Sequence, residues 1–179
     1  PLLWETPMPP KIPVFMYWHD SNLPPTVALC MQNWKKYSEM SKYNFEPVLV
    51  TNDNITSFID IQHPCISDNH NYPAVKSDFI RLALLQKHGG VYFDASVILT
   101  EPLDWIIGDG LGHNYFQAFA NQRNMNVSCN VPVIETSFLA APPNHPLINA
   151  WLTELLKIDA CFDTDMYRYY ERTAPAIQN

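Results

Sequence analysis

The sequence predicts a three-layer α/β fold, in which helices cover both faces of a central sheet. Apolar segments of strand length alternate along the chain with stretches whose apolar residues recur at helical spacing. Polar residues follow the first three predicted strands, at Asp20, Asn52 and Asp94. Because ligands bind at the carboxyl ends of strands in such sheets, we expect one edge of the sheet to carry the site.

Length and composition favour one domain over residues 1–179. Whether that domain has further terminal segments outside this sequence stays open. The chain has 179 residues, 47% hydrophobic and 13% aromatic, which is enough for one sizeable core. The net charge of −7 argues against nucleic acid or an anionic membrane as the main partner. No stretch has the length of a membrane span, so membrane association would depend on segments not in this chain. The compartment stays open, with the cytoplasm favoured over the lumen of the secretory pathway.

The cysteines predict buried free thiols. They lie far apart and show no CxxC spacing, which indicates neither a zinc site nor a disulfide framework. The triplet Asn54-Ile55-Thr56 fits the acceptor sequence for N-glycosylation, but such triplets often arise by chance. The four cysteines are Cys30, Cys65, Cys129 and Cys161.

In the first part of the chain, Val14–Trp18 is predicted as a buried strand and Thr26–Tyr37 as an amphipathic helix introduced by two prolines. Phe45–Val50 is predicted as a second strand. A short helix over Ile55–Ile61 and a loop over Gln62–Tyr72 should follow.

The central stretch is predicted as a helix from Pro73 to His88 and a strand over Val91–Phe93. Gly89 supplies the left-handed stop between them. Asp78 and Arg81 are three residues apart and share one face of this helix, so they form either a structural ion pair or a ligand clamp. Asp94 ends the strand and is either a turn residue or a catalytic one.

After Asp94 the pattern is less regular, and strands, turns and one helix are expected in alternation. A polar loop near the acceptor side should precede the last strand region, and a mixed tail follows from Asp159. The expected elements are a strand at Val97–Leu99, a short turn or strand at Trp105–Ile107, a strand at Tyr115–Ala120, a loop at Asn121–Asn130, a strand or strand pair at Val133–Ala141 and a helix at Pro146–Leu156.

The central stretch reads S-D-x-x-R-x-x-x-L-x-x-x-G-G-x-Y-x-D. This pattern resembles the nucleotide-sugar site of DXD-type glycosyltransferases of the Rossmann-like GT-A fold. The most similar groups are the capsular polysaccharide synthesis transferases, the yeast-type outer-chain mannosyltransferases and the clostridial glucosylating toxins. The matching residues are Ser77, Asp78, Arg81, Leu85, Gly89, Gly90, Tyr92 and Asp94.

The resemblance implies a nucleotide-sugar-binding domain that transfers a hexose or deoxyhexose from a nucleoside diphosphate sugar to a hydroxyl of a glycan or polysaccharide, with retention of configuration. It implies Asp78, Arg81, Asp94 and Glu135 as catalytic candidates. The implied donor-binding residues are Trp18, Asn52, Asp53, Ser77, Asp78, Arg81, Tyr92, Asp94 and Ala95.

The resemblance also implies Mn or Mg as cofactor, held by Asp94 and Ser96. Here the chain departs from the common pattern, because Asp94-Ala95-Ser96 replaces Asp-x-Asp and the second carboxylate is missing. Two alternatives therefore stay open. One is a non-catalytic domain of the same fold that binds a sugar nucleotide or a glycan. The other is a metal-dependent hydrolase with Asp78 and Asp94 as ligands.

Overall fold

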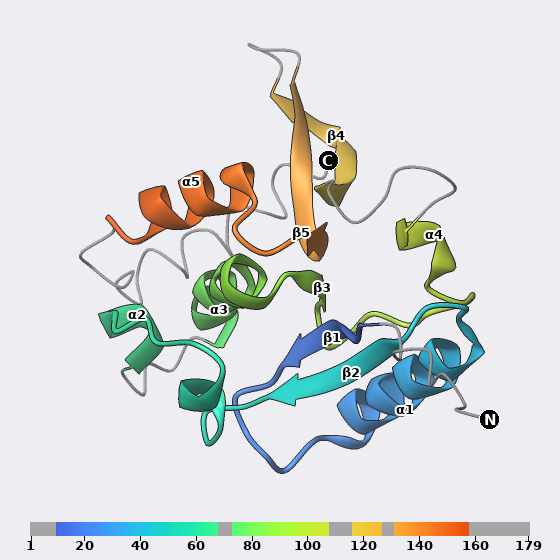
Figure 1. Ribbon diagram of the computed structural model, residues 1–179. Coiled ribbons are helices and arrows are strands. Elements are labelled where there is room, and N and C mark those ends of the chain that lie inside the picture. Colours follow the sequence, from blue (N-terminus) through green and yellow to red (C-terminus); the bar gives the residue numbers. More distant parts are fainter. Residues whose placement is uncertain (1–9, 68–72, 108–115, 127–130, 158–179) are drawn as a thin grey trace, which may run out of the picture.

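The computed structural model describes residues 10–67, 73–107, 116–126 and 131–157, with the backbone alone described at 121–126 and 131–133. They contain a five-stranded sheet in the order β2-β1-β3-β5-β4 (Figure 1). The strands are β1 (Ile12–Tyr17), β2 (Phe45–Val50), β3 (Gly90–Phe93), β4 (Gln117–Asn126) and β5 (Val131–Ala141). The helices are α1 (Pro25–Met40), the 3-10 helix η1 (Ile55–Ser57), α2 (Pro64–Ser67), α3 (Pro73–His88), α4 (Asp104–Ile107) and α5 (Pro146–Leu155).

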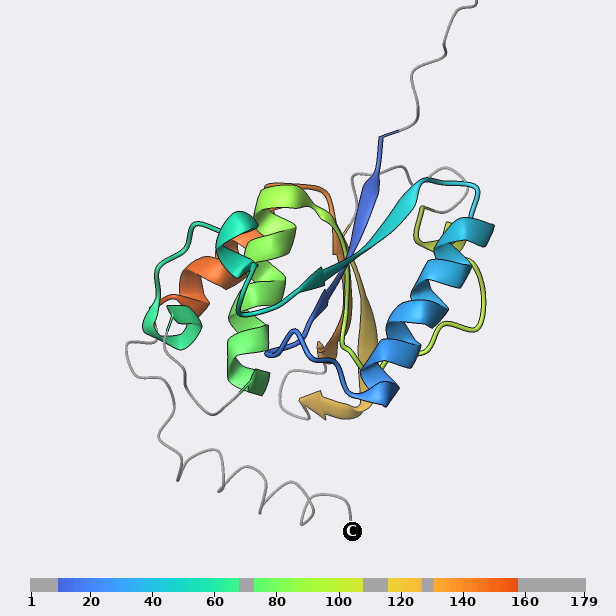
Figure 2. The same cartoon turned by 90° about the horizontal axis from the view of Figure 1, so that it is seen from below.

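Helices cover both faces of the sheet, which confirms the predicted three-layer α/β architecture. Helices α2, α3 and α5 lie on one face, and α1 and α4 lie on the other (Figure 2). Strand β3 contributes to both cores because its side chains alternate: Tyr92 packs in the cluster with α3, and Val91 and Phe93 pack in the cluster with α1.

Strand β3 joins a parallel half of the sheet to an antiparallel half. β1 pairs with β2 and with β3 in parallel, whereas β5 pairs with β3 in the antiparallel direction. The carboxyl ends of β1, β2 and β3 therefore meet at one edge. Because β5 runs the other way, with Phe93 opposite Phe138, the residues just before Phe138 reach the same edge.

The early elements were predicted well. The strands at Val14–Trp18 and Phe45–Val50 and the helix at Thr26–Tyr37 are confirmed as β1, β2 and α1. The helix from Pro73 and the strand that ends at Asp94 are also confirmed. These segments bury their apolar faces against neighbouring elements, so their periodicity reports their structure directly.

The predicted strand at Val97–Leu99 is wrong, because this segment carries no strand. Trp34 Nε1 donates to the Val97 carbonyl at 2.8 Å. The Asn33 side chain binds both backbone groups of Leu99, at 2.8 and 3.0 Å. Side chains of α1 therefore occupy backbone groups that a strand would use for its ladder.

Three further predictions need correction. Within the expected loop Gln62–Tyr72, residues Pro64–Ser67 form α2. Trp105–Ile107, expected as a short turn or strand, belongs to the four-residue helix α4. The expected loop at Asn121–Asn130 is strand as far as Asn126, because β4 continues along β5 there.

The strand at Tyr115–Ala120 is confirmed from Gln117 onward, and the last strand and helix are confirmed as β5 and α5. The tail from Asp159 lies outside the described residues. None of the helices in the described part of the chain has the length and apolarity that crossing a membrane requires.

The cysteine prediction holds at one position and fails at another. Cys30 is a buried free thiol, as expected. Cys65 is disulfide-bonded, which contradicts the expectation of free thiols. Sequence spacing gave no signal for this bond, since connectivity cannot be deduced from spacing alone. Cys129 and Cys161 lie outside the described residues.

We expect Gly90→Ala to destabilise the protein by about 2 to 4 kcal/mol. Gly90 has φ +97°, and a Cβ there would lie 2.4 Å from the Pro13 carbonyl oxygen. Thermal unfolding should show a melting temperature roughly 5 to 10 °C lower. Thr100→Ala, at an exposed loop position, is the control and should change stability by less than about 0.5 kcal/mol. An unchanged melting temperature for Gly90→Ala would contradict the close packing of β3 on β1.

Candidate active site

A cavity of about 440 Å³ lies at the carboxyl ends of β1 and β3, within the size range of small-molecule sites. Its walls come from the end of β1, the first turns of α3 and the turn after β3. Most of the site residues predicted from sequence line it. They are Trp18, Ser77, Asp78, Arg81, Tyr92, Asp94, Ala95 and Ser96.

Arg81 is the buried cation of this site, with only 4% of its surface exposed. Its Nε donates to the Ser77 carbonyl at 3.2 Å, and its Nη2 donates to the Ser77 hydroxyl at 2.8 Å. Its Nη1 donates to the Thr136 carbonyl of β5. The guanidinium also lies over the Tyr92 ring, 5.0 Å from its centroid. The protein thus engages each of the three guanidinium nitrogens.

The same Arg81 Nη2 binds two carboxylates, at 3.0 Å from Asp78 Oδ1 and 3.3 Å from Asp94 Oδ1. The side chain of Asp78 is 51% exposed and that of Asp94 is 35% exposed, so both remain accessible from the cavity. Asp78 and Arg81 are in contact as an ion pair, which agrees with a structural pair and with a ligand clamp alike. The structure adds Asp94 as a third member, which the helix spacing alone did not indicate.

The pKa of both carboxyl groups is raised above its ordinary value. Burial raises the pKa of Asp78, the Arg81 charge lowers it, and the Asp94 charge raises it again. Burial also raises the pKa of Asp94, against the lowering effect of Arg81, and the charge of Glu135 adds to the rise. In each case burial is the largest effect, so one arginine does not fully offset the cost of holding these charges here.

Three predicted site residues do not line the cavity. Asn52 is linked to it indirectly, because Tyr17 donates its hydroxyl to Asn52 Oδ1 at 2.9 Å. Asp53 lies in an exposed turn. Glu135 is exposed on β5, and its charge acts on Asp94.

Sequence reasoning missed three participants in this site. Tyr17 and His19 line the cavity on either side of Trp18. The carbonyl of Thr136 fixes Arg81 from the neighbouring strand. A backbone acceptor has no sequence signature, whereas the position of Tyr17 and His19 at a strand end could have indicated them.

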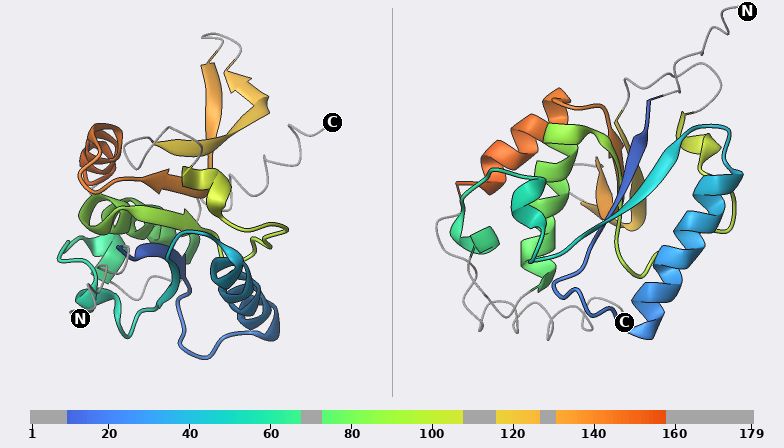
Figure 3. Two further views of the ribbon diagram at one scale, coloured as in Figure 1. Left: turned by 45° about the vertical axis from the view of Figure 1, so that its right-hand side comes forward. Right: turned by 60° about the horizontal axis from the view of Figure 1, so that its bottom comes forward.

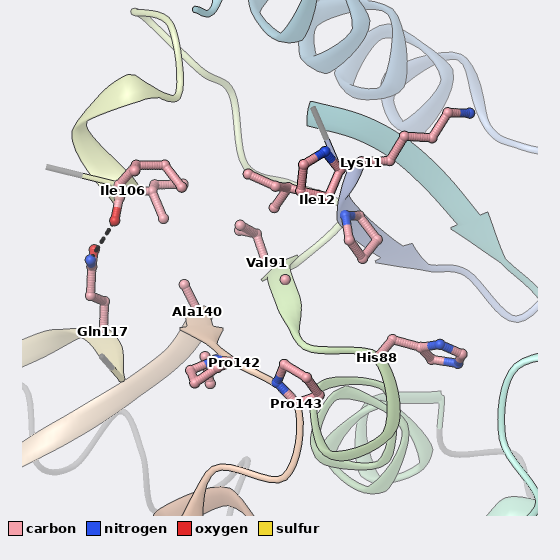
Figure 4. A pocket seen from close by; sticks show the side chains of 14 residues that line it. Lys11, Ile12, His88, Val91, Ile106, Gln117, Ala140, Pro142 and Pro143 are labelled. Atoms are coloured by element: carbon pink, nitrogen blue, oxygen red, sulfur yellow. Dashed lines mark hydrogen bonds between the residues drawn. The ribbon is translucent and has the colours of Figure 1, made fainter. Parts of the chain in front are cut away.

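A second cavity, of about 200 Å³, lies at the opposite end of β1 and β3 and is mainly apolar (Figure 4). Three of its polar side chains form hydrogen bonds or ion pairs with other groups of the protein. Lys11 pairs with Glu46 at 2.7 Å, His88 Nε2 lies 2.8 Å from the Phe58 carbonyl oxygen, and Gln117 donates to the Ile106 carbonyl. The larger cavity, with its exposed carboxylates, is therefore the candidate active site.

The described residues contain no group of three or more His, Cys, Asp or Glu side chains that could hold a metal ion. Mg and Mn do not require such a group, because they are often held by one or two carboxylates, with phosphate oxygens and waters completing the shell. Asp94 with Asp78 or the Ser96 hydroxyl provides oxygen donors of this kind at the cavity.

The chain is similar in sequence to one protein family and to one curated protein. Residues 5–158 match the family described as Capsular polysaccharide synthesis protein. An uncharacterized glycosyltransferase of Acanthamoeba polyphaga mimivirus is 30% identical over 122 residues, which cover 64% of this chain and 45% of that protein. The chain thus spans less than half the length of this curated relative.

Two solved structures are also similar. One is described as PaToxG glycosyltransferase, with a TM-score of 0.48 and 15% identity over 82% of this chain and 60% of that chain. The other is the galactosyltransferase LgtC in complex with donor and acceptor sugar analogues, with a TM-score of 0.46 and 12% identity over 84% of this chain and 67% of that chain.

We expect Asp78→Asn and Asp94→Asn each to raise the melting temperature at pH 7. A carboxyl group whose pKa is raised by folding contributes stability below its unfolded pKa of about 3.9 and loses that contribution as pH rises through the folded pKa. Replacing either carboxyl group by an amide removes this loss of stability at neutral pH, and Arg81 keeps the other carboxylate as its partner. The gain should vanish below about pH 4.

The measurement is a series of melting curves from pH 3 to 8. Asp60→Asn is the control, because Asp60 forms only a surface pair with Lys87 in the described structure. Lower melting temperatures for both site variants at pH 7 would show that the ion pairs outweigh the cost of burial.

Proposed function

The chain belongs to the capsular polysaccharide synthesis protein family, and we propose that it is a glycosyltransferase. In this proposal it moves a sugar from a nucleoside diphosphate sugar to a hydroxyl of a glycan or polysaccharide. The observation that carries the proposal is the cavity at the carboxyl edge, where buried Arg81 holds Asp78 and Asp94 side by side. Such an arrangement suits a ligand that combines a diphosphate with sugar hydroxyls.

We propose that the donor lies along the sheet edge from β1 towards β5. Trp18, half-buried at the cavity wall, offers an aromatic face for the base. Asn52 supports this end through its bond with Tyr17. Asp78, which is half exposed, accepts hydrogen bonds from hydroxyls of the donor sugar.

The reaction forms a bond between an acceptor oxygen and the anomeric carbon of the donor, while the bond from that carbon to the diphosphate breaks. The nucleoside diphosphate leaves with the electron pair and the negative charge of the broken bond, and the acceptor hydroxyl gives its proton to a phosphate oxygen of this leaving group. A bound Mg or Mn ion would supply Lewis acid stabilisation of the charge that develops on the diphosphate. Asp94, with Asp78 or Ser96, would hold the ion.

Arg81 has a positioning role in this proposal. Each of its guanidinium nitrogens donates within the protein and only 4% of its surface is exposed, so we propose that it orients Asp78 and Asp94 rather than binding phosphate by itself. Its charge also lowers the pKa of both carboxyl groups against the effect of burial, which favours the ionised forms that bind metal and accept hydrogen bonds from hydroxyls.

Family resemblance alone supports the finer features of the proposal. We propose a hexose or deoxyhexose as the donor sugar, retention of configuration, and one transferase domain for the chain. Glu135 lies on β5 beyond Asp94, where it would face the donor sugar or the acceptor.

A screen of UDP, GDP and TDP sugars, with and without Mn, should identify at least one that raises the melting temperature. A ligand that binds only the folded state stabilises it by mass action, by about 2.7 kcal/mol at one hundred times its Kd. The same compounds should release nucleoside diphosphate when a glycan acceptor is present. A panel with neither stabilisation nor release would reject the transferase proposal, and stabilisation without release would favour a binding domain.

Asp94→Asn should lower the rate of transfer about 100-fold or more, because it removes a charge from the diphosphate site at nearly constant shape. Donor turnover per folded molecule is the measurement, with Asp60→Asn as the matched control. Full activity in Asp94→Asn would mean that this end of β3 does not bind the donor.

Ser96→Asp should lower the Mn concentration needed for half-maximal activity by roughly tenfold. It restores the second carboxylate two residues after Asp94, at a position that lines the same cavity. Titration of Mn against wild type and variant is the measurement, with Thr100→Asp as an exposed control. Equal Mn responses in all three proteins would argue against a metal at this site.

A further inference from the structure

Trp105 and Phe119 form an exposed aromatic surface, here named the aromatic platform. Trp105 is 39% exposed and Phe119 is 47% exposed. Their ring planes are nearly parallel, with an interplanar angle of 15° and centroids 6.4 Å apart. Two neighbouring aromatic side chains that are each more than a third exposed offer apolar area on which a ligand can pack.

The aromatic platform rests on a rigid base. The ring of Phe138, which is buried, lies 5.1 Å from the ring of Trp105 and 4.8 Å from that of Phe119. Phe138 in turn stacks on Phe93 at 5.1 Å. The platform is thus fixed to β3 through packed rings, and its two faces are held in place before any ligand binds.

The sheet order places the platform next to the part of β5 that reaches the carboxyl edge, on the face of the sheet that α4 covers. Phe119 lies on β4 opposite Glu135 of β5, and Phe138 lies opposite Phe93, the residue before Asp94. Helix α4, which carries Trp105, lies next to β4 and β5 (Figure 3). Along the carboxyl edge the order is therefore Trp18 on β1, Asp94 after β3, Glu135 on β5 and the platform.

Resting on the function proposed above, we infer that the aromatic platform is the acceptor subsite and stacks a sugar ring of a glycan on Trp105 and Phe119. A sugar ring presents an apolar face of C–H groups and a rim of hydroxyls. Nearly parallel aromatic rings suit the apolar face, and the neighbouring Glu135 carboxylate suits the hydroxyls.

The position of the platform favours a glycan over a protein partner. With the base of the donor near Trp18 and the diphosphate near Asp94, the transferred sugar points towards β5. An acceptor stacked on the platform would meet it from the side opposite the nucleotide. The charge of Glu135 also acts on Asp94, so this carboxylate lies within electrostatic range of the end of β3. A protein contact would need no such continuity with the donor cavity.

The test uses saturation-transfer NMR with methyl glycosides of common hexoses and deoxyhexoses, in the presence of UDP or GDP and Mn. We expect Trp105→Ala and Phe119→Ala each to weaken glycoside binding roughly tenfold, as for aromatic residues at the centre of a binding surface. Trp105→Phe keeps an aromatic face and should retain most of the signal. Tyr43→Ala is the matched control, because Tyr43 is 37% exposed and precedes β2 at the opposite end of the sheet.

The melting-temperature shift caused by the nucleoside diphosphate is measured on the same proteins. A retained shift with weaker glycoside binding in the two alanine variants supports the inference. A retained shift with equal glycoside binding in all variants overturns it while the transferase proposal stands. If the nucleoside diphosphate does not shift the melting temperature of the wild type either, the result counts against the transferase proposal itself. If glycosides give no signal with wild type, or if the variants alter only the oligomeric state, the platform is a protein contact or an unused surface and the inference is wrong.

Discussion

The burial of one guanidinium is the constraint on which the carboxyl edge of this protein depends. A charge that is almost fully removed from water is tolerated only when its donors are satisfied and an opposite charge lies close. Arg81 meets this requirement by contacting α3 through Ser77, β5 through the Thr136 carbonyl, and Asp94 at the end of β3. The same contacts that satisfy the arginine therefore fix the relative positions of the elements that line the cavity.

The opposite end of β3 is positioned by close packing of the backbone rather than by charge. Gly90 lies so close to the Pro13 carbonyl that no side chain fits between them, and Gly89 packs in the same way against Pro143. Both glycines have positive φ, which lets the chain turn from α3 directly into the sheet. Strand β3 is only four residues long, so the position of Gly90 determines where Asp94 lies relative to Trp18.

Sequence patterns predicted the elements that bury an apolar face, and they failed where distant side chains decide the backbone. The helix that carries Asp78 and Arg81, and the strand before Asp94, follow from periodicity and from Gly89. The Val97–Leu99 segment has the composition of a strand, yet hydrogen bonds from α1 hold it outside the sheet. For the site, the residue types were predictable. That one arginine serves both carboxylates was not, since this depends on how α3 packs on β3.

The meeting of parallel and antiparallel halves at β3 has a consequence for how such a protein can diversify. The residues that line the candidate cavity lie on β1, α3 and the end of β3, whereas β4 and β5 form an antiparallel pair on the other side of β3. Insertions or exchanges between β4 and β5 would alter the outer side of the edge without moving Arg81 or its two carboxylates. Changes in that pair would therefore alter one half of the sheet edge while the half built around Arg81 keeps its geometry.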